Sequence, residues 1–429
     1  MKNWAGNLEF HPKSILTPTS TESAQALVKA HLSANKNIRM RGSAHSWTGL
    51  IATKESFLHL DEMQGLMEVD ASTQLIKAKA GTKLSLFGEE AFKHNLALPN
   101  QGDINHQSLA GAMSTGTHGT GVTLQSMSNQ IKNLTLIAGT GEILNIDGNK
   151  NPELLNAVGV SFGSVGLMTE ATLKMIPAYK LKVETFAEDM KTSLEKFKSR
   201  LKDNRHLEMF YFPVGDWSIV KMMNVTEEKE SPQSKFQKVS ELVLENWLYE
   251  GLNILAHKTN SYRGPDKFMR KFVDHKVFVN WSHRAFPSAR TVRFMEMEFN
   301  LPIEKFEEVF EELKASIKKN NFQTLFPIEI RFVKGDELWL SPAYKRDSVY
   351  FAIHTYIQQD FRPYFEEMQN IFKRHGGRPH WGKWHSLKHD DLAAVYPKWQ
   401  EFKQVRSELD PKGLWLNEHL RSLFDKPEA

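Results

Sequence analysis

The stretch most informative about the fold is Arg39-Met40-Arg41-Gly42-Ser43-Ala44-His45-Ser46-Trp47. The run from Asn37 to Met40 predicts a short strand, which ends in a turn of small residues. Such a turn lets several backbone N–H groups point at one spot, and a nest of this kind binds phosphate or pyrophosphate. His45 lies inside the turn, where phosphate binding needs no imidazole, so taken alone the pattern also fits a surface turn with a chance histidine.

A second informative stretch is the glycine-rich run from Gly102 to Gly121. Its composition disfavours any ordinary helix or strand. A polar run of this length in a compact domain is usually shaped around a ligand, and the interspersed Ile104, Leu109 and Met113 argue against a flexible loop. The chain has neither a Walker A sequence nor a Gly-x-Gly-x-x-Gly between strand and helix, which disfavours a P-loop and a nicotinamide Rossmann site. A third glycine turn, from Gly163 to Leu173, feeds a strand and is a weak signal by itself.

Two later segments concentrate chemically active side chains. In Phe326-Pro327-Ile328-Glu329-Ile330-Arg331-Phe332, Glu329 and Arg331 are two apart on an apparent strand and hence on one face; the pattern alone also fits an ion pair across strands. The other segment is Arg378-Pro379-His380-Trp381-Gly382-Lys383-Trp384-His385. A zinc site at His380, His385 and His389 is disfavoured because no carboxylate or metal-ligand helix accompanies them. We therefore expect no metal.

Composition narrows the class of protein. A chain of 429 residues is long for one hydrophobic core and suggests two domains. With 55 basic and 51 acidic residues, the charge is too balanced to favour a nucleic-acid partner. The absence of cysteine excludes disulfides, iron–sulfur clusters and cysteinyl–flavin links. No apolar run is long enough to span a membrane, and the first residues do not resemble a secretory signal, so we expect a soluble, cytoplasmic protein.

The amino-acid composition of the chain changes near Pro177. We expect an N-terminal domain at residues 1–178, a second domain at 179–398 that is more charged and aromatic, and a C-terminal segment, 399–429, docked on the body. Expected helices are 23–34 with Thr21 as N-cap, 190–201 and 303–319. Expected strands are 37–40, 75–80, 134–138, 168–176, 290–299, 327–333 and 348–357. Lys229 to Lys238 is expected to be a loop or helix cap. The pattern predicts an α+β fold with helices on one side of a sheet.

Together, the first three segments resemble the vanillyl-alcohol-oxidase type of FAD-binding domain (PCMH type). In that family the Gly-Ser-x-His-Ser turn wraps the FAD pyrophosphate, and its histidine bonds to the flavin 8α-methyl group. The resemblance therefore implies FAD attached covalently to His45. The family turn usually has glycine where this chain has Ala44. The implied cofactor-binding residues are Arg41, Gly42, Ser43, Ala44, His45, Ser46, Ser108, Gly111, Ala112, Met113, Ser114, Gly116, Thr117, His118 and His380.

The last two segments resemble the branch of aldonolactone oxidoreductases and alditol oxidases, which includes L-gulono-1,4-lactone and D-arabinono-1,4-lactone oxidases. The resemblance runs from about residue 3 to residue 424. It implies that Arg331 and Lys383 polarise the reacting hydroxyl and the flavin, that Glu329 orients the substrate, and that His354 is a secondary active-site candidate. Asp103 and Tyr356 fall at substrate-binding positions, where alditol oxidases have serine and threonine.

The resemblance implies an oxidase of a sugar-derived lactone that transfers hydride to the flavin and releases hydrogen peroxide. Gly102 aligns beside the flavin, where a small side chain leaves a path for O2. An alditol oxidase of the xylitol or sorbitol class and a dehydrogenase using another acceptor stay open. A nicotinamide reductase of the peptidoglycan-precursor type is disfavoured by the Glu-x-Arg and His-Trp-Gly-Lys segments. A binding protein without turnover would have lost the charged trio of Glu329, Arg331 and Lys383. We expect a monomer that binds a small lactone or polyol.

Overall fold

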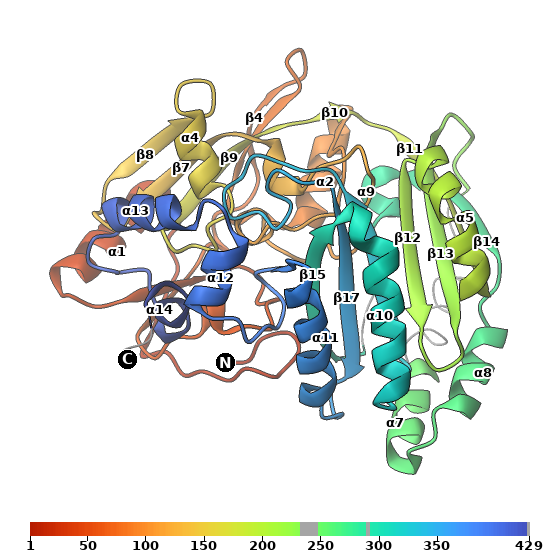
Figure 1. Cartoon of the computed structure of the whole chain (residues 1–429). Helices are drawn as coiled ribbons and strands as arrows, with labels where there is room; N and C mark the ends of the chain where they lie inside the picture. The colour runs from red at the N-terminus through yellow and green to blue at the C-terminus, as the bar shows by residue number, and fades with distance from the viewer. Residues whose placement is uncertain (232–247, 289–291, 427–429) are drawn as a thin grey trace.

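The computed structural model describes residues 1–231, 248–288 and 292–426. Most of the N-terminal half is built on two sheets (Figure 1). The first has the order β1-β3-β2, with parallel pairs, and comprises Ser14–Leu16, Ser56–His59 and Ile38–Arg41. The second is antiparallel, with the order β4-β5-β9-β7-β8: Leu66–Asp70, Leu75–Lys79, Gly166–Lys174, Ile131–Ala138 and Ile143–Asp147. A small ladder pairs β6 (Leu96–Ala97) with β10 (Ile176–Pro177).

The second half is built on an antiparallel eight-stranded sheet with the order β14-β11-β13-β12-β16-β17-β15-β18. Helices α10 and α11 lie along one side of this sheet (Figure 1). Because β12 pairs with β16 although more than a hundred residues separate them, this sheet brings distant side chains onto one surface. The strands, in sheet order, are Lys276–Trp281, Lys180–Asp189, Trp217–Thr226, His206–Phe212, Ile328–Val333, Ser348–Tyr356, Phe294–Pro302 and Arg378–Pro379.

The helices cover both halves. Those from α1 to α5 are Thr21–Ser33, Leu84–Lys93, Leu109–Ser114, Pro152–Val158 and Met190–Asp203. Those from α7 to α11 are Tyr249–Thr259, Arg263–Lys271, Ser282–Ala285, Phe306–Lys319 and Arg362–Arg374. The last three, α12 to α14, are His389–Val395, Trp399–Leu409 and Glu418–Phe424. Short 3-10 turns are η1 Gly49–Ile51, η2 Met127–Gln130 and η4 Ile303–Lys305.

Most expected elements are present, with corrections at their ends. The first helix begins at Thr21 and not at Ser23, because Ser20 is the N-cap and its hydroxyl accepts the Ser23 N–H at 3.1 Å. The helix expected from Ile303 begins as a 3-10 turn and becomes α-helical at Phe306. The strand expected from Arg290 starts at Phe294, and Arg290 lies outside the described residues, as does most of the segment expected to be a loop at 229–238.

The glycine-rich run departs more clearly from expectation, because it contains the short helix α3, Leu109–Ser114. The Ser108 side chain caps this helix by accepting the Gly111 N–H at 3.3 Å. Leu109, Ala112 and Met113 are fully buried and anchor it. Burial of one face thus outweighs the low helix propensity of the sequence.

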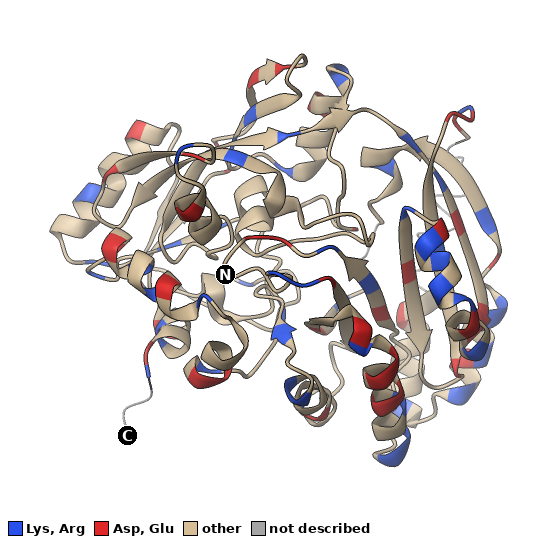
Figure 2. Ribbon diagram, turned by 45° about the horizontal axis from the view of Figure 1, so that its top comes forward, with Lys and Arg blue, Asp and Glu red and all other residues tan. Residues whose placement is uncertain are grey.

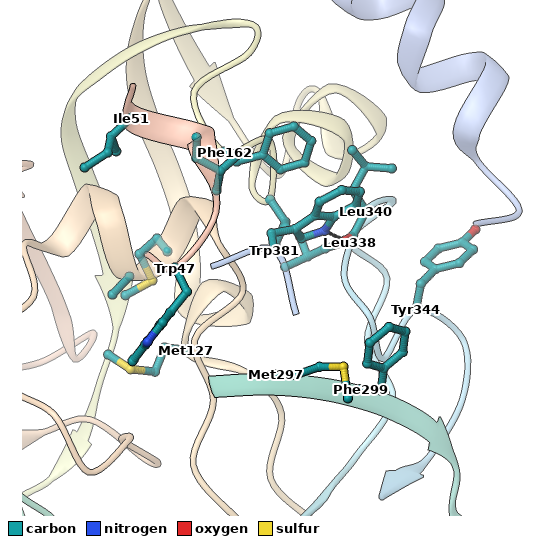
Figure 3. Close-up of a cluster of buried hydrophobic side chains, with 14 of the residues drawn as sticks. Trp47, Ile51, Met127, Phe162, Met297, Phe299, Leu338, Leu340, Tyr344 and Trp381 are labelled. Carbon is teal, nitrogen blue, oxygen red and sulfur yellow. Dashed lines mark hydrogen bonds between the residues drawn. The ribbon is translucent and has the colours of Figure 1, made fainter. Parts of the chain in front are cut away.

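The two halves share one hydrophobic core. Trp47 and Phe162 from the first half cluster with Met297 and Phe299 of β15 and with Trp381 (Figure 3). The Trp381 indole N–H donates to the Leu340 carbonyl at 2.7 Å, so this buried polar group is satisfied. A shared core of this kind holds the facing surfaces of the two halves in a fixed relation.

The C-terminal segment returns to the first half. Leu414, Trp415, Leu416 and Leu420 are buried. The fully buried Arg39 in β2 donates to the carbonyls of Gly163 at 2.7 Å and Trp415 at 3.0 Å, and burial lowers its pKa to about 9. Arg39 therefore links β2 to the third glycine turn and to the C-terminal segment.

Acidic and basic residues are interspersed over the ribbon, with both signs present on the helices of the second half (Figure 2). Within the ranges that the structure describes, no helix has both the length and the apolar character needed to cross a membrane.

Candidate active site

The turn after β2 meets the N-terminus of α3. A Cβ placed on Gly42 would lie 2.3 Å from the Ser108 hydroxyl oxygen, and one on Gly111 would lie 2.9 Å from the same atom. The two loops therefore approach closely at both positions, and a side chain at either one would displace the Ser108 hydroxyl group. The Ser43 hydroxyl donates to the His106 carbonyl at 2.5 Å and accepts from Lys83 at 3.1 Å. These contacts place the Lys83 ammonium beside the turn, and a cation next to a turn of small residues suits a diphosphate.

Ala44 has φ = 58°, in the left-handed region. A residue with a Cβ pays a steric penalty there that glycine avoids, which explains why a related turn would favour glycine. The conformation is held in place, because the Trp4 N–H donates to the Ala44 carbonyl at 2.8 Å and Asn3 Nδ2 donates to the Ser46 carbonyl at 2.9 Å. The segment from Asn3 to Asn7 thus braces the turn from outside.

The His45 ring is held by two contacts. Its Nδ1 lies 3.0 Å from the Ser43 carbonyl oxygen, and its face stacks on Trp4 with 5.9 Å between ring centroids. Burial lowers the pKa of His45, and the nearby Lys383 and Lys83 act in the same direction against the hydrogen bond to Ser43. At neutral pH the ring is therefore predominantly neutral and keeps a lone pair on one nitrogen.

One elongated cavity runs along the turn, α3, the third glycine turn and the segment from His380 to Lys383. Of the residues expected to bind the cofactor, ten line it: Arg41, Gly42, Ser43, Ala44, His45, Ser46, Ser108, Gly111, Ser114 and His380. Leu50, Ile51, Phe162 and Leu167 add apolar walls. A polar turn beside apolar walls fits the diphosphate and the ring systems of FAD.

The other expected cofactor residues lie elsewhere. Ala112 and Met113 are in the core, because they lie on the face of α3 that points away from the cavity lined by Gly111 and Ser114. Gly116, with φ = 72°, packs near Pro342 and Val160. Thr117 and His118 line a second, smaller pocket.

This second pocket is rich in charged groups and adjoins the first. We call it the charged pocket; His380 and Lys383 line both it and the elongated cavity. Besides Thr117 and His118, it brings together five further expected residues: Asp103, Glu329, Arg331, Lys383 and His380. Gly102 lines it as well.

Arg331 stands at the centre of a network of carboxylates. Its Nε lies 2.5 Å from Glu208 Oε1 and its Nη2 lies 3.1 Å from Asp103 Oδ2. Nη2 also pairs with Glu329, as expected for residues on one face of β16. Although burial alone would lower the pKa of Arg331, these carboxylates raise it well above its ordinary value. Lys221 joins the network, 3.4 Å from Glu208 and 3.7 Å from Asp103.

Lys383 pairs with Glu296, and its ammonium lies 4.6 Å from the centroid of the Trp47 ring. Burial alone would raise the pKa of Glu296, but Lys383 and His354 lower it to about 2. Glu296 is therefore ionised throughout the neutral range.

Two histidines flank Glu298. His118 Nε2 lies 3.0 Å from Glu298 Oε1, and its Nδ1 lies 2.9 Å from the Gly119 carbonyl oxygen. His380 Nδ1 accepts the Gly382 N–H at 3.1 Å, and burial lowers the pKa of His380 to about 4. His380 is thus neutral, with its proton on Nε2.

Two groups among the described residues have the spacing of metal ligands: His118 with Glu298 and His380, and Asp103 with Glu208 and Glu329. His385 and His389 belong to neither. The second group surrounds Arg331, and in the first His118 is hydrogen-bonded to Glu298. These contacts account for both clusters without an ion.

The structure separates His354 and Tyr356 from the charged pocket. On β17, Ala352 lines that pocket, whereas His354 lines a different, apolar cavity together with Glu329. Tyr356 is buried beyond it, with 6.5 Å between its ring and that of His257. Side chains two residues apart on a strand are about 7 Å apart along it. Ala352, His354 and Tyr356 therefore share one face of β17 but lie in three different surroundings.

Sequence reasoning missed Glu208, Glu296 and Glu298. The alternation in Phe294-Met295-Glu296-Met297-Glu298-Phe299 is a usable signal, since two acidic side chains on one face of an otherwise apolar strand need partners when buried. The sequence around Glu208 gives a weaker signal for a buried carboxylate. Its partner Arg331 lies on another strand, and only the register between β12 and β16 brings the two together.

Two family models match the chain. Residues 171–423 match D-arabinono-1,4-lactone oxidase, and residues 12–147 match an FAD binding domain. An L-gulono-1,4-lactone dehydrogenase of Mycobacterium tuberculosis is 31% identical over 426 residues, covering 98% of each chain. An L-gulonolactone oxidase of Bos taurus is 29% identical over 438 residues, covering 99% of this chain and 98% of that one.

Solved structures with similar folds include cholesterol oxidase from Brevibacterium sterolicum, with a TM-score of 0.78 at 16% identity over 99% of this chain and 96% of that one. A chitooligosaccharide oxidase gives 0.73 at 15% identity, covering 100% and 94%. At such identities the similarity shows the fold alone, the two-domain fold that these oxidases share. The matches over the whole length of the chain establish that it belongs to the D-arabinono-1,4-lactone oxidase family of FAD-dependent oxidoreductases.

Proposed function

We propose that the protein oxidises a sugar-derived lactone of the L-gulono-1,4-lactone or D-arabinono-1,4-lactone type with covalently attached FAD, passing the electrons to O2 and releasing hydrogen peroxide. The observation that carries the proposal is the shared wall between the two pockets. Lys383 and His380 line both, so a small substrate held by the charged pocket would lie against a flavin held by the elongated cavity.

FAD supplies the hydride acceptor at its N5 atom when it is bound. The protein orients the substrate carbon and stabilises the negative charge that develops on its oxygen. Lys383 and Arg331 provide positive charge, but the charge of Arg331 is offset by three neighbouring carboxylates, whereas Lys383 pairs with Glu296. We therefore assign the larger share of the electrostatic stabilisation to Lys383.

The polar groups around Arg331 suit a polyhydroxylated ligand. The carboxylates of Asp103 and Glu329 accept hydrogen bonds from hydroxyl groups, and His380 presents its Nε2–H as a donor. Glu329 and Asp103 also form ion pairs with Arg331. The same two carboxylates would therefore orient both the substrate and the Arg331 guanidinium group.

Covalent attachment through His45 is supported by its place in the elongated cavity and by its neutral ring, because only a neutral imidazole has a lone pair for bonding to the flavin 8α-methyl group. We expect the yellow colour to stay with the denatured chain in the natural protein and to be lost from it in His45→Ala. Acid-stable flavin in His45→Ala would show that another residue forms the bond.

The substrate class is supported by the names of the relatives, which include both oxidases and a dehydrogenase of gulonolactone. Gly102 supports oxygen access, since a Cβ there would lie 3.1 Å from the His118 carbonyl oxygen and narrow the pocket. Peroxide release measured with L-gulono-1,4-lactone, D-arabinono-1,4-lactone, xylitol and sorbitol tests the assignment. Faster turnover of either alditol would favour the alditol oxidase alternative, and lactone oxidation only with an artificial acceptor would favour a dehydrogenase.

A further inference from the structure

The segment from Asn3 to Asn7, which we call the brace, folds around the side chain of Asn3. Asn3 is buried, and its Oδ1 accepts the backbone N–H groups of Gly6 at 3.0 Å and Leu8 at 3.1 Å. Its Nδ2 donates to Asn7 Oδ1 at 2.7 Å and to the Ser46 carbonyl at 2.9 Å. All four hydrogen-bonding positions of this amide are used, so the brace has one well-defined conformation and is bonded to the turn after β2.

The brace contacts the turn on both sides of His45. The Trp4 N–H donates to the Ala44 carbonyl at 2.8 Å, and Asn7 Nδ2 donates to the Trp47 carbonyl at 3.1 Å. The first of these bonds also holds Ala44 in its left-handed conformation. Because the backbone is fixed before and after His45, the point from which the imidazole side chain leaves the backbone is fixed as well.

The Trp4 ring fixes the plane of the imidazole. The χ2 torsion of histidine has a broad energy profile, so the contact of Nδ1 with the Ser43 carbonyl leaves the ring able to tilt. The Trp4 indole lies face to face with the His45 ring, with 22° between the planes. Trp4 is itself held by edge contacts with Trp47 at 5.9 Å and Phe294 at 5.3 Å. The described residues that line the elongated cavity include His45 and Trp47 but not Trp4, so Trp4 acts on the cofactor through His45.

We propose that Trp4 is a positioning residue for the covalent attachment of FAD, because its indole holds the His45 ring in the plane from which a ring nitrogen can bond to the 8α carbon of the flavin. In the attachment, that carbon and the imidazole nitrogen each give up one hydrogen atom and bond to each other. The two electrons and two protons that are released pass by way of the flavin ring to O2, which becomes hydrogen peroxide. The inference rests on the proposed function, because it presupposes the bond at His45.

Two substitutions of Trp4 separate the stacking face from the apolar bulk. Trp4→Phe keeps a flat aromatic ring, whereas Trp4→Leu keeps apolar volume without a ring. Trp281→Leu is the matched control, because Trp281 is also half-buried and packs on another ring, that of Phe92, with 4.8 Å between centroids. The described residues that line the elongated cavity and the charged pocket do not include Trp281.

The rate of attachment is the quantity to measure. Each chain is prepared from a riboflavin-starved host and mixed with FAD in air, and acid-stable flavin on the chain is followed in time, with total bound flavin measured in parallel. Because a displacement of about 1 Å can slow a reaction about 10²-fold, we expect attachment to be about 10- to 100-fold slower in Trp4→Leu and within about threefold of the natural rate in Trp4→Phe and Trp281→Leu. Total bound flavin should be the same in all four proteins.

Attachment at the natural rate in Trp4→Leu, or equally slow attachment in Trp4→Leu and Trp281→Leu, would overturn the inference. So would a loss in Trp4→Leu that is explained entirely by lower total flavin binding. Should Trp4→Leu fail to fold, Asn7→Ala decides, since Asn7 is exposed and its loss frees the Trp47 carbonyl. Slower attachment in Asn7→Ala at an unchanged melting temperature supports the inference, and attachment at the natural rate overturns it.

The same assay separates this inference from the proposed function. If His45→Ala lacks acid-stable flavin while Trp4→Leu attaches flavin normally, the bond at His45 stands and only the role of Trp4 falls. Acid-stable flavin in His45→Ala, or none in the natural protein, would refute the proposed bond and the inference together. The assay contains no lactone, so its outcome does not depend on the assignment of the substrate.

Discussion

Replacing Lys383 by methionine separates its charge from its bulk. In the natural protein Lys383 pairs with the buried Glu296, whose pKa is lowered from 4.5 to about 2 against the opposing effect of burial. A shift of this size corresponds to roughly 3 kcal/mol, of which His354 supplies a part. Lys383→Met therefore removes a cation from the wall shared by the two pockets and leaves Glu296 without its ammonium partner.

We expect Lys383→Met to slow flavin reduction by the lactone about 10²- to 10³-fold, the range for loss of one preorganised charge-stabilising group. The assay is anaerobic stopped-flow measurement of flavin bleaching, with flavin content measured in parallel. Because the folded pKa of Glu296 is depressed, its stabilising contribution is fully present above pH 4.5 and is lost as the pH falls towards 2. In the variant this contribution is already reduced at pH 7, so we expect unfolding to cost up to roughly 3 kcal/mol less there.

Lys373→Met is the matched control, since Lys373 forms an exposed pair with Asp391 at 2.7 Å. Exposed pairs contribute about 0–1 kcal/mol, so this variant should behave like the natural protein. Flavin reduction by Lys383→Met within about twofold of the natural rate, at normal flavin content, would refute the role assigned to Lys383. A fall in rate explained entirely by lost flavin would refute it equally.

Three further predictions concern the turn, acid stability and oxygen access. Ala44→Gly should raise the free energy of unfolding by about 0.5–1 kcal/mol, because it relieves a left-handed alanine; a lower melting temperature would contradict this. Four buried histidines have a pKa lowered to about 3 or 4, namely His206, His380, His385 and His419, so below pH 6.5 each should reduce the free energy of unfolding by up to about 1.4 kcal/mol per pH unit. Asp336, whose pKa is raised to about 6, takes up a proton in the folded protein and offsets the effect of one histidine. Melting temperatures measured from pH 7.5 to 5 check this, and a flat profile would refute it. Gly102→Ala should slow reoxidation by O2 more than reduction by lactone, measured in separate half-reactions, and equal effects would argue against a role in oxygen access.

Local patterns predicted the elements of the site well where two residues lie close in the chain. The period of two in a strand placed Glu329 and Arg331 on one face, and the structure pairs them. The same period links Ala352, His354 and Tyr356, but it could not show that successive positions along β17 face different pockets. That outcome depends on which elements cover each part of the sheet.

The carboxylate network around Arg331 depends on contacts between distant segments. Glu208 faces Arg331 because β12 and β16 pair with these two residues in register, across 122 intervening positions. No sequence pattern within either strand specifies that register. Likewise, Ala44 is visible in the sequence as a substitution in a glycine-rich turn, but its strain became evident only from the backbone angle.

The most direct test of lactone oxidation is a single turnover without oxygen. The natural holoprotein is mixed anaerobically with L-gulono-1,4-lactone, D-arabinono-1,4-lactone or xylitol, and loss of the flavin's visible absorption is followed in time. We predict complete bleaching by at least one of the lactones, faster than by xylitol, and return of the absorption with release of peroxide when O2 is admitted. No bleaching by either lactone, or faster bleaching by xylitol, would contradict the proposed function.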